Sequence, residues 1–245
     1  ADIYCDTRLI ARVIDRLCPE PPLFGAGPVS AAASHFWSGA EFFAPGAALS
    51  LHENRDYIAK DVADDRRAYF NFLDFDRFEE DAPHFRSQLR AFARLIDRSL
   101  ADRPFLDGDR PGACDIDAYF NIWMARGNIG SSPRLFADKH ALLAWRGRMD
   151  AFGEGVRTEI SAETAIDIAR QSAAAPVGPS VPDESGAAPG DAVSVAAADY
   201  GKDPVEGVLD FVDDDEIVIS RKDLRAGHVR VHFPRIGFVL RRLAN

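Results

Sequence analysis

The sequence predicts a chain of two parts, an all-α helical bundle followed by a small antiparallel β module. Three observations lead to this fold class. Apolar residues recur every three or four positions through much of residues 6–171, which is the period of a helix. Near the C-terminus they alternate with a period of two, as they do in half-buried strands. Between these regions lies the segment 172–190, in which 15 of 19 residues are Ala, Pro, Gly or Ser.

The clearest helical pattern lies in residues 83–100. Five apolar residues are spaced by four, three, four and four positions there, so they share one face of a helix. A second stripe ends at Phe152 in a helix expected to begin near Asp138, and the glycines at 153 and 155 suit its C-terminal end. Further helices are expected over residues 6–17, 29–43, 64–72, 115–125 and 161–171.

The β module follows the Ala- and Pro-rich segment. In the run HVRVHF, Val229, Val231 and Phe233 point to one side of a strand and the polar residues between them point to the other. Ile217 and Ile219 alternate in the same way, and four or five short strands would fill residues 191–245. The composition of 172–190 cannot bury enough apolar surface to order itself, so we expect a flexible linker there.

Composition limits the classes of function. The 245 residues carry a net charge of −10, and no run approaches the ~18 apolar residues of a membrane-spanning helix. The three cysteines form no CxxC pair, which argues against a disulfide framework or a thiolate zinc site, and we expect a cytoplasmic protein. His228 and His232 lie four residues apart on a strand, about 13 Å, so we expect no metal site.

Two motifs place polar groups at helix starts. Asp6 and Thr7 precede the amphipathic run LIARVIDRL, where the free amides of the first turn and the helix dipole can receive a carboxylate, although an ordinary helix cap is the alternative. The second motif is FLDGDRPGACDIDAYFNIW, residues 105–123. Gly112 suits the position before the helix, and the Asp115 carboxylate can reach back to its amide. This predicts a structural cap.

The motifs DTRLIARVIDRL and FLDGDRPGACDIDAY resemble two parts of cytosolic glutathione transferases. The first resembles the turn and helix that close their thioredoxin-like domain, and the second the capped sixth helix of their helical domain. ALLAWRGRMDAF resembles the tryptophan-bearing helix that follows. The resemblance implies a remnant of the thioredoxin-like domain over residues 1–20 and a transferase C-terminal-like helical domain over 21–171. The linker 172–190 and the β module 191–245 follow. Gly112 departs from the family, which usually has Ser or Thr there.

The resemblance also implies a function, the attack of glutathione thiolate on a small electrophile. Asp6 and Thr7 would bind the γ-glutamyl end of glutathione, with Thr7 on the carboxylate and Asp6 nearer the ammonium. The family's catalytic side chain matches no residue here, so we expect this chain to lack the thiol-activating domain and to be inactive alone. The resemblance further implies a homodimer that uses glutathione as co-substrate.

For the electrophile, the first choice is the aromatic cluster in HFWSGAEFF. Its members are Phe36, Trp37, Phe42 and Phe43. A cluster of this kind also suits the core or a subunit interface.

Two other functions remain open. One is a non-catalytic helical protein-interaction module, because the same scaffold serves such roles. The other is anion or nucleic-acid binding through the β module, since residues 221–245 carry seven Lys or Arg against a single Asp. We do not expect nucleic acid to be the partner, because the acidic run from Asp213 to Glu216 offers counter-charges to these arginines.

Overall fold

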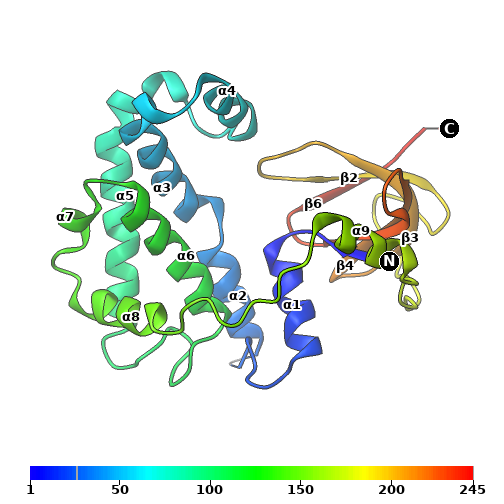
Figure 1. Ribbon diagram of the computed structural model, residues 1–245, viewed down its shortest axis with the longest axis horizontal. Helices are drawn as coiled ribbons and strands as arrows, with labels where there is room; N and C mark the ends of the chain where they lie inside the picture. Colours follow the sequence, from blue (N-terminus) through cyan, green and yellow to red (C-terminus); the bar gives the residue numbers. More distant parts are fainter. Residues whose placement is uncertain (26, 245) are drawn as a thin grey trace. The chain divides into compact units, whose positions relative to one another are not determined.

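The computed structural model describes residues 1–25 and 27–244, which fall into two compact units (Figure 1). The helical unit comprises Asp15–Gly155, and the sheet unit comprises Ala1–Ile14 together with Val156–Asn245. None of the helices in the described ranges is long and apolar enough to cross a membrane.

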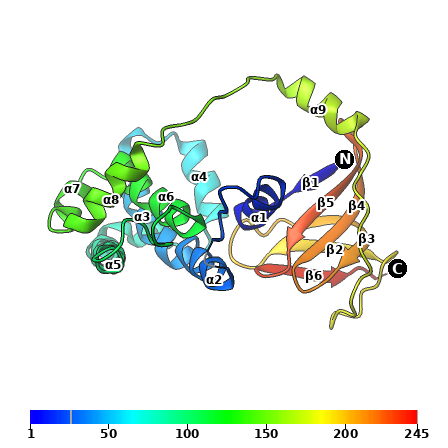
Figure 2. The same cartoon turned by 90° about the horizontal axis from the view of Figure 1, so that it is seen from below.

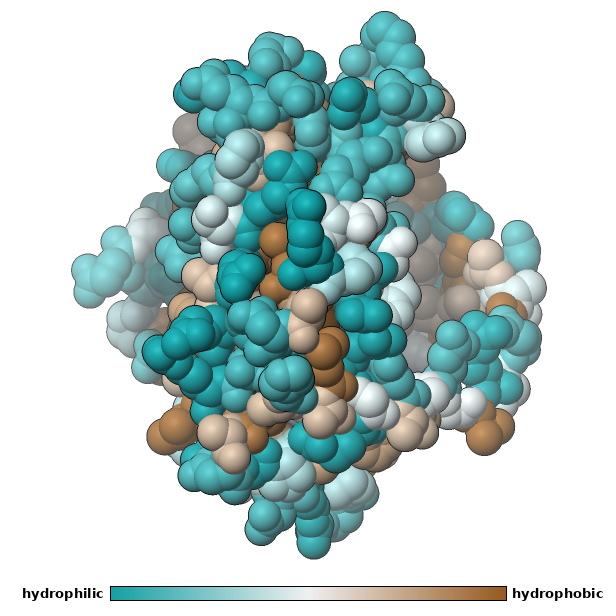
Figure 3. Space-filling view, turned by 90° about the vertical axis from the view of Figure 1, so that its left-hand side faces the viewer, coloured by the Kyte–Doolittle hydropathy of each residue, from teal (hydrophilic) through white to brown (hydrophobic). Residues whose placement is uncertain are grey.

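The helical unit is built around the long helix α5, whose first turn carries three acidic residues that complement the helix dipole. In the view of Figure 3, the nearer surface of the helical unit is mostly hydrophilic with a narrow apolar band. The elements, with 3₁₀ helices labelled η, are α2 (Pro28–Trp37), α3 (Ala40–Glu53), η1 (Arg55–Tyr57), α4 (Lys60–Tyr69), η2 (Phe75–Arg77), α5 (Phe78–Ser99), α6 (Ala113–Asn128), α7 (Ser132–Phe136) and α8 (His140–Asp150).

The apolar stripes predicted from the sequence form the core of this unit. Leu89 and Ile96 of α5 are buried in one core cluster with Ile122 of α6 and with Leu142 and Trp145 of α8. The helix expected over 29–43 is two helices, α2 and α3, because the helical conformation is interrupted at Ser38 and Gly39.

The sheet unit contains a six-stranded sheet whose order is β1-β5-β4-β3-β2-β6 (Figure 2). Strand β1 runs parallel to β5, and the other neighbouring pairs are antiparallel. Residues Thr7–Leu17 form α1, which starts in this unit. The elements are β1 (Asp2–Tyr4), α9 (Ala162–Gln171), β2 (Ala192–Ala197), β3 (Val205–Val212), β4 (Glu216–Asp223), β5 (Gly227–Pro234) and β6 (Phe238–Arg242).

The period-two pattern predicted the core of the sheet. Ile219 lies opposite Val231, and Ile217 lies opposite Phe233, all four buried on one face. The fold class predicted from the sequence is nevertheless wrong. The sheet is mixed, because the first residues of the chain add β1 beside β5, with Ile3 opposite Val231. The chain is therefore not an all-α helical bundle with a small separate antiparallel module.

The segment 172–190, expected to be a flexible linker, runs along the sheet. The Val212 amide donates to Ser180 Oγ (3.2 Å), and the Val181 amide donates to the Val212 carbonyl oxygen (2.9 Å). Asp183 forms an ion pair with Arg235 at 2.7 Å, with only 6% of its side chain exposed. Hydrogen bonds and one largely buried ion pair therefore hold a segment that has little apolar surface of its own.

Candidate functional site

The predicted glutathione-binding pair lies where β1 turns into α1. The Cys5 amide donates to the His232 carbonyl oxygen of β5 (2.9 Å), which fixes this turn to the sheet. Asp6 has φ 70°, a left-handed conformation that Asp tolerates better than most residues. Its Oδ1 accepts the Arg8 amide (2.8 Å), and its carbonyl oxygen accepts the Ile10 amide (3.0 Å). Asp6 therefore caps α1.

The start of α1 has the chemistry of an anion receptor. Thr7 is exposed at the first helical position, and in the described part of the chain no acceptor bonds its amide or that of Leu9. These donors and the positive end of the helix dipole favour a carboxylate. Because Asp6 uses Oδ1 on the helix, its second oxygen can still accept from an ammonium group.

Sequence reasoning missed a charged cluster beneath this turn. His232 is buried, with Nε2 2.9 Å from Asp2 Oδ1 and Nδ1 3.1 Å from Glu216 Oε1. Burial opposes the charge on His232, but the two carboxylates outweigh it and raise its pKa above the ordinary value. Burial acts against the charge on Asp2 too, yet hydrogen bonds from the Ala175 amide and His232 lower the pKa of Asp2.

This cluster joins strands from both ends of the chain. The local sequence places His232 on the polar face of a strand. No pattern near it indicates that β1 pairs with this strand, with Tyr4 opposite His232. Nearby, burial and then the charge of Asp6 raise the pKa of the Cys5 thiol, so Cys5 has little thiolate character.

The four aromatic residues predicted to contact an electrophile lie in two different surroundings. Phe36, 44% exposed, and Trp37 line a cavity of about 430 Å³ in the helical unit. Phe42 is buried in the core and stacks on Phe92 at 4.5 Å, and Phe43 packs against Phe70. The structure therefore brings only the first two together at an open cavity.

The cavity that Phe36 and Trp37 line is apolar with few polar groups, the composition typical of small-molecule sites. Cys114 is its only thiol among the lining residues, and Cys114 Sγ donates to the Ser30 carbonyl oxygen (3.2 Å). Burial first, and then the charge of Asp107, raise the pKa of Cys114 to about 12. Cys114 is thus a packed thiol rather than a nucleophile.

Comparison with solved structures adds a whole-chain match. The crystal structure of a GST-like protein from Pseudomonas syringae superposes with a TM-score of 0.72 at 28% identity, covering 99% of this chain and 79% of that one. GST denotes glutathione S-transferase. The chain has a GST-like fold. A glutathione S-transferase domain-containing protein from Marinobacter aquaeolei VT8 is more distant, with a TM-score of 0.45 at 21% identity over 61% of this chain and 67% of that chain.

No protein-family model matches the chain, and the search of curated proteins found no match. The whole-chain match extends the correction of the fold class, because the GST-like fold takes in the sheet unit and the helical unit together. From the sequence we expected a transferase C-terminal domain that carries only a remnant of the N-terminal domain, at residues 1–20. The whole-chain match does not support this expectation.

In this GST-like chain the second motif forms a buried cap at the start of α6. Asp115 is completely buried, and its Oδ1 accepts the Leu106 amide and Trp145 Nε1, both at 2.7 Å. Its Oδ2 accepts the amides of Asp107 and Gly112, both at 3.1 Å. The carboxylate is fully used by these four donors and therefore holds structure rather than doing chemistry.

Gly112 departs from the Ser or Thr of the family for a steric reason. A Cβ at this position would lie 1.9 Å from Asp107 Oδ2 and 2.8 Å from the Leu23 carbonyl oxygen. The described surroundings therefore leave no room for a side chain, and the cap consists of the Asp115 half alone.

The basic residues of the C-terminal strands are partly neutralised within the sheet unit of this GST-like chain. Arg230 pairs with Asp210 at 2.8 Å, and Arg242 pairs with Asp191 at 3.2 Å. With the Arg235 pair, three of the seven cations counted in the sequence form ion pairs with acids of the same unit.

Proposed function

We propose that the protein uses glutathione as the nucleophile in a transfer to a small electrophilic molecule. Two observations support the proposal, the whole-chain likeness to a GST-like protein and the start of α1, where an exposed Thr7 stands beside the Asp6 cap. The second carries it, because it supplies donors for a carboxylate and an acceptor for an ammonium group within two residues. These are the two charged groups of a γ-glutamyl end.

In this proposal each residue has a defined role. The Thr7 amide and hydroxyl bind the γ-glutamyl carboxylate, and the positive end of α1 stabilises its charge. Asp6 accepts from the α-ammonium with the oxygen that the Arg8 amide leaves available. We assign no residue of this chain to activation of the thiol.

The electrophile would bind in the cavity lined by Phe36 and Trp37. Its aromatic wall, in which Phe36 is 44% exposed and Trp37 is buried behind it, suits a flat apolar molecule that carries a leaving group. The glutathione thiol would first lose its proton to solvent. The thiolate sulfur would then form the new bond to the electrophilic carbon, and the leaving group would depart with the electron pair of the bond that breaks.

Calorimetric titration with glutathione tests the binding step. Thr7→Val keeps the shape of the side chain but removes the hydroxyl, and loss of one hydrogen bond to a charged group should weaken binding by about tenfold or more. Ser161→Ala is a matched control, because Ser161 caps α9 in the same unit by accepting the Thr164 amide. It should leave the affinity for glutathione unchanged.

The outcomes separate the proposal from its alternatives. No heat of binding with glutathione would favour the helical interaction module, and equal loss in both variants would show a general loss of structure. A selective loss in Thr7→Val supports the proposed role. For the electrophile, Phe36→Ala should raise the KM for an activated aryl chloride without changing the affinity for glutathione.

A further inference from the structure

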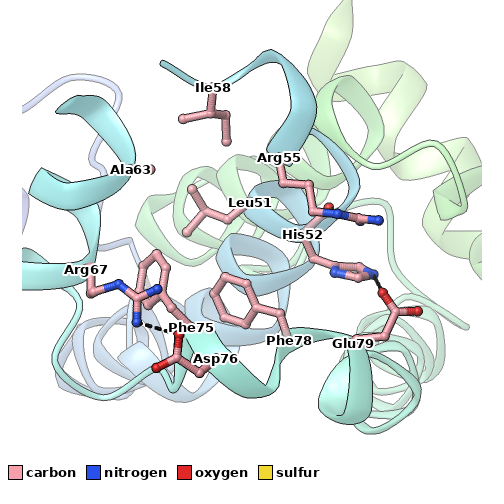
Figure 4. A pocket seen from close by; sticks show the side chains of 10 residues that line it. All are labelled: Leu51, His52, Arg55, Ile58, Ala63, Arg67, Phe75, Asp76, Phe78 and Glu79. Carbon is pink, nitrogen blue, oxygen red and sulfur yellow. Dashed lines mark hydrogen bonds and ion pairs between the residues drawn. The ribbon is translucent and has the colours of Figure 1, made fainter. Parts of the chain in front are cut away.

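The helical unit has a second cavity, of about 300 Å³, that none of the residues discussed above lines. Figure 4 shows its lining side chains, which come from the end of α3, from η1, α4 and η2, and from the start of α5. Its volume corresponds to about ten water molecules, at ~30 Å³ each. It therefore has room for a ligand of roughly ten non-hydrogen atoms.

The walls of this cavity are apolar and aromatic. Leu51, Ile58, Ala63, Phe75 and Phe78 are each half-buried around it. The rings of Phe75 and Phe78 lie 4.7 Å apart at an angle of 36°. Half-buried rings of this kind present both face and edge to a ligand, so they favour an aromatic group in the cavity.

The polar groups at the cavity are partly paired. Arg67 pairs with Asp76 at 3.0 Å, and its guanidinium also lies 5.1 Å from the centre of the Phe75 ring. His52 Nε2 lies 3.7 Å from Glu79 Oε2. These pairs account for both carboxylates that line the cavity.

Arg55 is the lining arginine that takes part in no such pair. Its Nη1 donates to the His52 carbonyl oxygen at 2.8 Å, and among the described residues no carboxylate lies within ion-pair distance of it. A guanidinium has five N–H donors, and a carboxylate is the ligand that uses two of them at once. The cavity thus joins an apolar aromatic interior to a cation without an acidic partner.

We propose that this cavity binds a small aryl carboxylate, with its ring against Phe75 and Phe78 and its carboxylate on Arg55. Phenylacetate, with ten non-hydrogen atoms, matches the room available. At the efficiency usual for small ligands, the dissociation constant should be about 1 mM or lower. Binding needs no glutathione, so the proposal stands or falls separately from the proposed function.

The test is a titration of the full chain with phenylacetate in the absence of glutathione. Ligand-detected NMR and calorimetry measure the binding. Arg55→Met keeps an unbranched apolar stem and removes the charged guanidinium, and it should weaken binding at least tenfold. Arg66→Met is the control, because Arg66 lies on α4 outside the cavity in an exposed ion pair with Asp65. Phenylacetamide, the neutral analogue, should bind the unaltered chain at least tenfold more weakly.

A second pair of variants identifies which cavity is occupied. Ala63→Phe fills the proposed cavity, and Ala33→Phe fills the cavity lined by Phe36 and Trp37. Loss of binding in Ala63→Phe alone supports the proposal. Loss in Ala33→Phe alone, equal affinity for the acid and the amide, or unchanged binding in Arg55→Met would each overturn it.

Discussion

The buried Asp115 carboxylate gives the sharpest prediction about stability. Asp115→Ala removes the acceptor of four donors at once, the amides of Leu106, Asp107 and Gly112 and the indole of Trp145, at 2.7–3.1 Å. In the unaltered protein, the side chain that accepts all four hydrogen bonds has no exposed surface. In the variant they lose their acceptor inside the helical unit.

The size of the effect follows from these contacts. A buried donor without an acceptor costs about 1–3 kcal/mol, and water that enters the space left by the carboxylate offsets part of the loss. The lower end of that range for four donors gives about 4 kcal/mol. This is a large part of the free energy of unfolding of a domain, which is about 5–15 kcal/mol. At about 2–4 °C per kcal/mol, the melting temperature should fall by roughly 8–16 °C.

Tryptophan fluorescence measures this loss in the right unit. The chain has three tryptophans, at positions 37, 123 and 145, and all lie in the helical unit. Urea unfolding followed by fluorescence should show a much lower midpoint in Asp115→Ala. Asp109→Ala, an exposed carboxylate in the same loop, should change the stability by less than about 0.5 kcal/mol. A loss below about 1 kcal/mol in Asp115→Ala would refute the reasoning.

Two further predictions concern titration and reactivity. Because the pKa of His232 is raised, its contribution to stability is complete below the ordinary value of about 6.5 and is lost as the pH rises through the folded value. The melting temperature of the full chain, followed by circular dichroism, should therefore fall as the pH rises from about 6.5 toward about 8.5, below the range in which thiols titrate. His232→Gln should remove this fall, and equal slopes in both proteins would contradict the reasoning. The buried Cys114, with a pKa of about 12, should react with iodoacetamide at pH 8 far more slowly than the exposed Cys18, which peptide mass spectrometry can measure, and equal rates would contradict its packed state.

Local patterns predicted much of the fold. The helical stripe of 83–100 is the buried face of α5, and the alternation of Ile217, Ile219 and Val231 is the core of the sheet. These features depend on neighbours within a few residues, which is what periodicity records. The capped start of α6 could be located for the same reason, because Gly112 and Asp115 are three residues apart.

Pairings between distant segments could not be predicted in this way. Strand β1 has only three residues, and its partner β5 lies at the other end of the chain, so no local pattern shows that Asp2 reaches His232. The order of segment 172–190 depends on specific partners such as Arg235 rather than on its own composition. For the aromatic cluster, spacing alone could not separate Phe36, at a cavity, from Phe42, in the core.

The central claim is that glutathione binds at the start of α1, and amide NMR shifts test it most directly. Titration of the isotope-labelled chain with glutathione should move the amide signals of Thr7, Arg8 and Leu9 most, saturably and with one dissociation constant. The dipeptide Cys-Gly, which lacks the γ-glutamyl group, should leave these three signals in place. If glutathione moved none of them, or if Cys-Gly moved them equally, glutathione recognition at this helix start would be contradicted.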